Sequence, residues 1–117
     1  MLAWATVVPA LVQAQSASHG QQLVESRCFA CHSLDANRVG PALRGVVGRK
    51  AGKAPDYVYS DALAAATFTW DATRIKAWLT DPEQVVPGQR MNYRVDLAQD
   101  REDVVAYLST LSAAPRQ

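Results

Sequence analysis

Three residues able to bind a metal or react as thiols lie within one short segment: Cys28, Cys31 and His32. They form the pattern Cys-x-x-Cys-His, and these are the only two cysteines in the 117 residues. Two thiols at this spacing match the separation of the two vinyl groups of a porphyrin, with which each forms a thioether, and the histidine that follows faces the iron. The pattern therefore predicts one covalently attached haem c, with His32 as an axial ligand.

Two other kinds of site use closely spaced cysteines. A structural zinc ion needs about four ligands, and outside the cluster the chain offers only His19 as a further Cys or His. A thioredoxin-type redox disulfide is typical of a strand-helix-strand setting. No stretch of the sequence alternates apolar and polar residues as a strand does. The sequence therefore favours covalent haem attachment over a structural zinc site or a redox disulfide.

The ligand on the opposite face of a haem iron separates electron carriers from enzymes and gas sensors. Met1 lies in a segment that we expect to be removed, and His19 belongs to the same predicted helix as the cysteines. Met91 follows the rigid Pro87-Gly88 turn. A lone methionine usually fills a core, but beside a haem Met91 is the predicted second ligand. Such a His/Met pair raises the reduction potential and leaves no open site, which favours a one-electron carrier over an enzyme.

Helices are expected to position these residues, and no strands are expected. The helices are predicted from after Ser18 into the cysteines, over residues 61–66, from a cap at Asp71 or Thr73 to before Pro82, and from a cap at Asp100 to about Ser112. The connections between them are rich in glycine and proline. Loops of that extent in a small domain need something to pack around, and a haem supplies it. The predicted fold class is all-α.

Length and charge restrict the protein further. The chain has room for one domain, and its formal net charge of +1 gives no support for a nucleic-acid or anionic-membrane partner. Residues 1–14 carry no charge and include an apolar run too short to span a bilayer. They predict a secretory signal cleaved between 14 and 18, a mature domain over 15–117 and a periplasmic location. No basic residue precedes Arg27, so the signal could start upstream of Met1, and the alternative is an uncleaved tail.

From Gly20 to about Leu111 the sequence resembles the class I cytochromes c, including the mitochondrial proteins and their close bacterial relatives. Beyond the cysteine motif, the resemblance rests on Gly40-Pro41-x-Leu43-x-Gly45, Gly48 to Gly52, Tyr59 to Ala62, Trp70, Asp81-Pro82, Pro87-Gly88-x-x-Met91 and Arg101 to Leu108. It implies terminal helices that cross steeply, with Gly20 and Val24 against Val104 and Tyr107. Shorter helices and loops would wrap around the haem.

The resemblance also implies roles for single residues. The Pro41 carbonyl would accept a hydrogen bond from the second nitrogen of His32 and so fix its tautomer. Arg49, Tyr59 and Trp70 would hydrogen-bond or neutralise a buried haem propionate. The alternative for these three is an ordinary aromatic core with a surface arginine.

Several positions depart from the family's pattern. Trp78 stands where the family commonly has a tyrosine near the ligand sulfur, and Leu63 stands where it commonly has an asparagine near a propionate. The family carries a ring of lysines around the exposed haem edge. This chain keeps only part of that positive charge, in Arg27, Arg38 and Arg90, and it has Glu83 and Gln84 where the mitochondrial proteins have lysines. These changes leave the reduction potential open, and they predict weaker and less salt-sensitive docking to an acidic partner.

The resemblance implies redox proteins as partners of a monomeric carrier. The donor would be a cytochrome-bearing complex or a dehydrogenase, and the acceptor an oxidase, a photosynthetic centre or another enzyme. The alternative is an electron-transfer subunit dedicated to one dehydrogenase.

Overall fold

The computed structural model describes residues 1–8 and 14–112. The helical elements are α1 (Ala17–Leu23), the π-helix η1 (Val24–Cys28), α2 (Asp61–Ala64), α3 (Ala72–Thr80), α4 (Pro82–Val85) and α5 (Ala98–Ser109). Within the described ranges the only β pairing is an isolated bridge between Lys50 and Thr69. The predicted all-α class is confirmed. No helix in the described part of the chain has the length and apolarity needed to cross a membrane.

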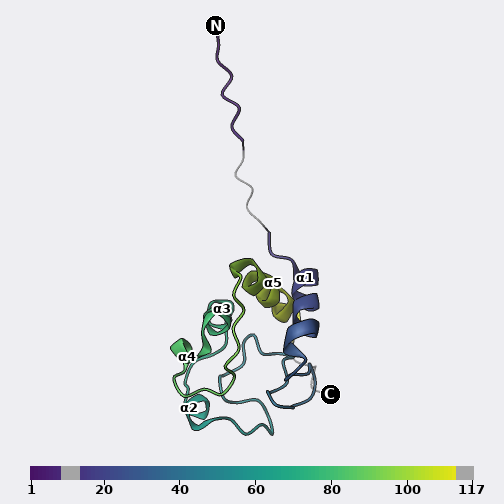
Figure 1. Cartoon of the computed structure of the whole chain (residues 1–117), viewed down its shortest axis with the longest axis vertical. Helices are drawn as coiled ribbons and strands as arrows, with labels where there is room; N and C mark the ends of the chain where they lie inside the picture. Colours follow the sequence, from purple (N-terminus) through teal and green to yellow (C-terminus); the bar gives the residue numbers. More distant parts are fainter. Residues whose placement is uncertain (9–13, 113–117) are drawn as a thin grey trace.

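The first and last helices cross closely, as Figure 1 shows for α1 and α5. Gly20 makes the contact possible, because a Cβ atom there would lie 1.8 Å from the Asp103 carbonyl oxygen and 3.0 Å from the Tyr107 Cβ. Val24 and Val104 are buried in the same core. Any larger residue at position 20 would force the two helices apart.

The predicted cap of α5 is wrong. Leu97 occupies the N-cap position, with no side-chain hydrogen bond, so Asp100 lies inside the helix. Asp100 and Asp103 are both buried against the N-terminal helix rather than folded back on the backbone of their own helix. Tertiary partners compete with local capping for a carboxylate. Asp103 takes such partners, the Ser16 N–H and His19, whereas Asp100 is paired, among the described residues, only with Arg27, at 3.8 Å. The helix also ends at Ser109, short of the predicted Ser112.

The other helix boundaries follow local capping. Ser16, two residues before the predicted start, caps α1 by accepting a hydrogen bond from the His19 N–H at 3.1 Å. Asp71 caps α3 as expected, accepting from the Arg74 N–H at 2.7 Å. The sequence analysis did not predict α4, which starts at Pro82 under an Asp81 cap. Proline at the first helical position is favourable because it has no N–H to leave unpaired.

Candidate haem site

One tight turn brings the attachment residues together. The N–H groups of Cys31 and His32 both donate to the Cys28 carbonyl, at 3.0 and 2.8 Å. Cys28 ends η1, whose wider turn lets the Phe29 N–H reach back to the Val24 carbonyl at 3.1 Å. Burial raises the pKa of the Cys28 thiol to about 11, although the nearby Arg27 charge opposes the rise. The thiol is therefore protonated at neutral pH, and Cys28 would hold a haem through a thioether formed by adding this S–H across a vinyl group.

The imidazole of His32 is held in a single orientation. Its Nδ1 donates to the Pro41 carbonyl at 2.8 Å, so the proton lies on Nδ1 and the lone pair on Nε2. A side chain at position 40 has no room, because a Cβ on Gly40 would lie 2.2 Å from the His32 Cε1. Burial lowers the pKa of His32, and the Pro41 hydrogen bond opposes this without reversing it. A half-buried neutral imidazole with a free Nε2 is able to bind a metal ion.

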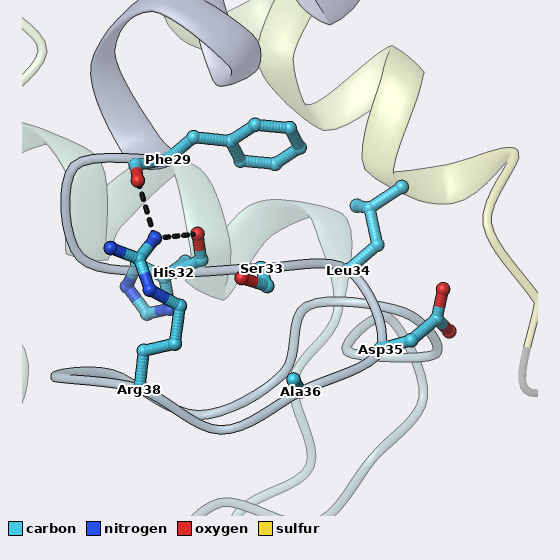
Figure 2. Close-up of a pocket in the computed structure, with 7 residues that line it drawn as sticks. All are labelled: Phe29, His32, Ser33, Leu34, Asp35, Ala36 and Arg38. Carbon is cyan, nitrogen blue, oxygen red and sulfur yellow. Dashed lines mark hydrogen bonds between the residues drawn. The ribbon is translucent and has the colours of Figure 1, made fainter.

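Arg38 braces this turn from outside (Figure 2). Its guanidinium donates to the carbonyls of Phe29 at 2.6 Å, His32 at 3.0 Å and Ala30 at 3.4 Å. Sequence reasoning assigned Arg38 only to the docking surface, because nothing local in the sequence pairs it with carbonyls six to nine residues earlier. The structure gives it a second role, since it stabilises the segment that carries both cysteines.

A surface depression of about 520 Å³ lies over the same turn (Figure 2). It is lined by Phe29, His32, Ser33, Leu34, Asp35, Ala36 and Arg38. Met91 and Trp70 do not line it. The depression is therefore not the space where the predicted ligands and propionate partners converge.

Met91 is held by a donor to its sulfur. The Trp78 indole Nε1–H donates to the Met91 Sδ at 2.9 Å, from the buried face of α3. The loop beneath it is braced by Gln89, which is buried and hydrogen-bonds to Glu83 at 3.1 Å and to Asn92 at 2.8 Å. Sequence reasoning missed Gln89, whose only signal was its place between the turn and the methionine. The thioether is thus fixed with one sulfur lone pair engaged.

Hydrogen bonds to backbone groups hold the residues assigned to the propionate. The Trp70 N–H donates to the Arg49 carbonyl at 2.8 Å, and the Tyr59 hydroxyl accepts from the Ala54 N–H at 3.0 Å, which leaves its own hydrogen free to donate. Burial lowers the pKa of Arg49, with Tyr59 acting in the opposite direction. The Trp70 ring packs edge-on against Trp78, with centroids 5.2 Å apart.

Arg49 supplies the test of whether a haem fits. Its Nη1 donates to the Ala42 carbonyl at 2.9 Å, but its Nε is buried with no hydrogen-bond partner among the described residues. A buried, unpaired cationic donor is costly and indicates a missing acceptor. A propionate is such an acceptor. Together with the free His32 Nε2 and the two thiols, this donor set fits an iron porphyrin.

A helical fold that presents one Cys-x-x-Cys-His turn defines a class of proteins that bind haem c covalently. The family model described as cytochrome c matches residues 17–112. Cytochrome c of Euglena viridis is 40% identical over 98 residues, which is 81% of this chain and 96% of the relative. Cytochrome c2 of Rhodoblastus acidophilus is 41% identical over 96 residues, or 79% and 90% of the two chains.

A solved structure agrees with these relatives. Cytochrome cH from Methylobacterium extorquens superposes with a TM-score of 0.77 and 42% identity, covering 81% of this chain and 98% of that one. The chain therefore belongs to the cytochrome c family, as a class I c-type cytochrome that binds haem c through Cys28 and Cys31. Proteins of this family carry electrons, and the predicted family, fold and cofactor are confirmed.

Proposed function

We propose that the protein is a one-electron carrier whose iron is ligated by His32 and Met91. The observation that carries this proposal is the hydrogen bond from Trp78 to the Met91 sulfur at 2.9 Å. A methionine that only fills a core needs no such donor, whereas a methionine that binds iron must present its sulfur in one orientation. A haem bound there supplies an iron that exchanges one electron between its ferric and ferrous states. With both axial positions filled by the chain, no site is open for a substrate.

The surrounding residues would keep that exchange fast and reversible. The Pro41 hydrogen bond fixes the tautomer of His32, and the Gln89 network fixes the loop of Met91. Neither ligand then has to move when the charge on the iron changes. Arg49, with Tyr59 and Trp70, would hold a propionate and so offset the cost of burying its charge.

Changing Met91 to Ala tests the ligand assignment. The variant should retain its covalent haem but become high-spin, bind carbon monoxide rapidly and show a lower potential. Unaltered protein should bind carbon monoxide or cyanide slowly. If Met91→Ala stays low-spin with an unchanged potential, another residue is the distal ligand. Rapid ligand binding by the unaltered protein would instead favour a peroxidase or gas sensor.

The periplasm is the location we propose, with cleavage of the leader after Ala14. Ser16 supports this choice, because its side chain caps α1 and its N–H donates to Asp103 at 2.8 Å. Cleavage after residue 16, 17 or 18 would remove Ser16 and with it both hydrogen bonds. The intact mass of the mature protein from a periplasmic extract tests both statements, and a start at Gln15 is expected.

The partners we propose are a redox protein donor and a redox protein acceptor that meet this cytochrome in turn. A dedicated subunit of one dehydrogenase is the second candidate, and one observation favours it. Val39 and Val58 are both strongly exposed on adjoining loops, which Tyr57 joins by donating to the Val39 carbonyl. Size-exclusion chromatography of native extract separates the two, since a carrier elutes at monomer size and a subunit elutes with its enzyme.

A further inference from the structure

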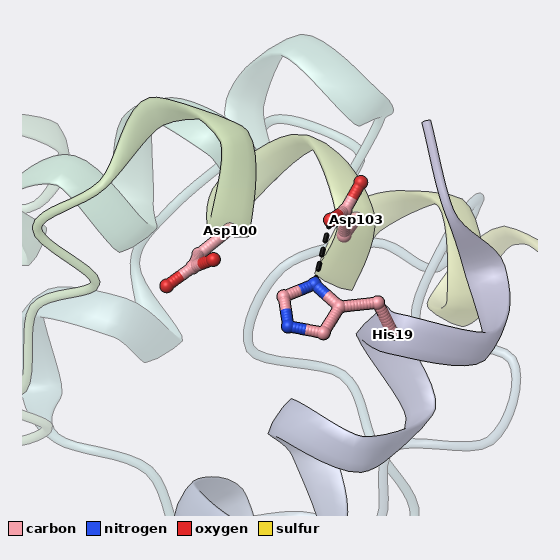
Figure 3. Close-up of side chains that lie close together, drawn as sticks. All are labelled: His19, Asp100 and Asp103. Carbon is pink, nitrogen blue, oxygen red and sulfur yellow. Dashed lines mark hydrogen bonds and ion pairs between the residues drawn. The ribbon is translucent and has the colours of Figure 1, made fainter. Parts of the chain in front are cut away.

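A second group of metal-ligating side chains lies at the crossing of α1 and α5, formed by His19, Asp100 and Asp103 (Figure 3). One ligand atom from each residue lies within 4.8 Å of the others. None of the three belongs to the haem site. The imidazole comes from the first helix and the carboxylates from the last, so an ion bound between them would join α1 to α5.

The cluster is open on one side and closed on the other. The His19 side chain is 45% exposed, whereas the side chains of Asp103 and Asp100 are 4% and 11% exposed. His19 Nδ1 lies 2.7 Å from Asp103 Oδ2, so the imidazole N–H donates a hydrogen bond to the carboxylate. An ion arriving from solvent would meet the imidazole first and the carboxylates behind it.

Asp103 is oriented by groups that stand outside the cluster. Its Oδ1 accepts from the Ser16 N–H at 2.8 Å and from the Gln99 Nε2 at 2.9 Å. These two donors occupy one oxygen and leave Oδ2 directed toward His19. Protein metal sites commonly fix a ligating carboxylate in this way, and loss of such support weakens metal affinity.

Asp100 points to a missing cation. Its side chain is only 11% exposed, and no hydrogen bond to its carboxylate occurs among the described residues. The nearest cation is Arg27, whose Nη1 lies 3.8 Å from Asp100 Oδ2, beyond hydrogen-bond range. The Arg27 side chain is itself 42% exposed, so solvent can receive it if an ion takes its place. A buried carboxylate with so little compensation gains from binding a cation.

We propose that His19, Asp100 and Asp103 bind one divalent transition-metal ion, with Zn²⁺ as the probe. One imidazole nitrogen and two carboxylate oxygens suit Zn²⁺, and a fourth position stays open to water. Binding through Nδ1 requires the imidazole proton to move to Nε2, so the ion takes the place of the hydrogen in the bond from His19 to Asp103. The protein with the ion bound should resist thermal unfolding better, because the ion binds only the folded arrangement of two helices.

The sequence makes this site easy to test. The chain contains two histidines, and His32 lies in the haem turn while both cysteines hold the haem. In the holoprotein His19 is therefore the only free imidazole. Calorimetric titration of the holoprotein with Zn²⁺ in a non-coordinating buffer should give one ion per chain. His19→Gln and Asp100→Asn should each weaken binding about tenfold or more. The matched control, Glu25→Gln, removes an exposed carboxylate from η1 and should leave the affinity unchanged.

Arg27→Gln distinguishes the proposed site from a lone surface histidine. Removing the guanidinium beside Asp100 removes a competing cation, so Zn²⁺ affinity should rise, and a lone histidine would be indifferent. Unchanged or weaker binding in Arg27→Gln contradicts the proposal. So does a result in which His19→Gln loses binding while a folded Asp100→Asn retains it. Visible spectra and thermal melts of every variant confirm that the fold is intact.

Discussion

The indole N–H of Trp78 donates to the sulfur of Met91 across 2.9 Å. The family commonly places a tyrosine here, and the larger indole reaches the same sulfur while also packing in the aromatic core. A donor to the sulfur withdraws electron density from a ligand and so favours ferrous iron. Trp78 thus links the packing of α3 to the reduction potential that we expect for this protein.

Replacing Trp78 by Phe should lower the potential, because the sulfur loses its donor and stabilises ferric iron better. A shift of up to about 40 mV corresponds to roughly 1 kcal/mol, the typical worth of one hydrogen bond. Protein-film voltammetry measures it. Trp78→Tyr, which restores a donor of smaller reach, should recover part of the shift. Equal potentials in all three proteins would make Trp78 a packing residue only.

The methionine ligand should survive to higher pH than in relatives whose loop carries a lysine. In the proteins that this chain resembles, a lysine of this loop replaces the methionine on the iron at high pH. Residues 83–94 contain no lysine, and Gln84 and Arg90 stand where the resemblance places those lysines. A guanidinium stays protonated and offers no lone pair. The nearest lysine, Lys76, lies in α3 and pairs with Glu102 at 3.0 Å.

A pH titration of the sulfur-to-iron charge-transfer band, with electron paramagnetic resonance of the product, checks this expectation. The product at high pH should be hydroxide-ligated or partly unfolded. A nitrogen-ligated low-spin species that forms at mildly alkaline pH and is absent from Lys76→Ala would contradict the prediction.

Arg38→Gln should loosen the haem-attachment turn, because three carbonyls lose a shared donor. We expect a loss of about 1 kcal/mol in the free energy of unfolding, since the guanidinium is exposed to solvent. The potential should also fall, because a positive charge near His32 is removed. Arg38→Lys keeps the positive charge but lacks the two guanidinium nitrogens that reach the three carbonyls. Its reduction potential should therefore lie closer to that of the unaltered protein than its stability does. Chemical denaturation and voltammetry of the three proteins give both quantities, and unchanged values in Arg38→Gln would contradict the brace.

Asp103 should make stability depend on acid pH. Burial acts to raise the pKa of Asp103, but hydrogen bonds from the Ser16 N–H, His19 and Gln99 outweigh it and leave the pKa below its usual value. A carboxyl with a depressed folded pKa stabilises the protein fully above the unfolded pKa, which is about 4 for aspartate. That contribution is lost as the pH falls through the folded value.

Asp103→Asn should therefore be less stable than the unaltered protein at pH 7, by roughly 1 to 3 kcal/mol, because the amide cannot satisfy the same donors. The difference should begin to shrink below about pH 4, where the carboxyl of the unfolded chain takes up a proton, and should be lost once the pH falls below the lowered pKa of the folded protein. Urea denaturation at several pH values measures it, with the exposed Asp96→Asn as the control. A difference that stays constant down to strongly acid pH would show that the lost packing, rather than the charge, matters.

The sequence alone determined the cofactor, the family and the all-α class. Covalent haem attachment depends on a spacing of five consecutive residues, and helix signals such as Asp71 before α3 act over one turn, so both are visible in the linear chain. The crossing at Gly20 was also predictable, through the resemblance, because close helix contact demands a small residue there.

The tertiary structure decided which partners the polar groups take. Asp100 was predicted to cap the last helix and is instead buried near Arg27, whereas Arg38, predicted only as a docking cation, also braces the haem turn. The unpaired Nε of Arg49 and the hydrogen bond from Trp78 to Met91 are likewise visible only in the tertiary structure. Each depends on residues that are distant in sequence or held by packing, and a hydrogen bond exists only where the whole fold brings donor and acceptor within about 3 Å of each other.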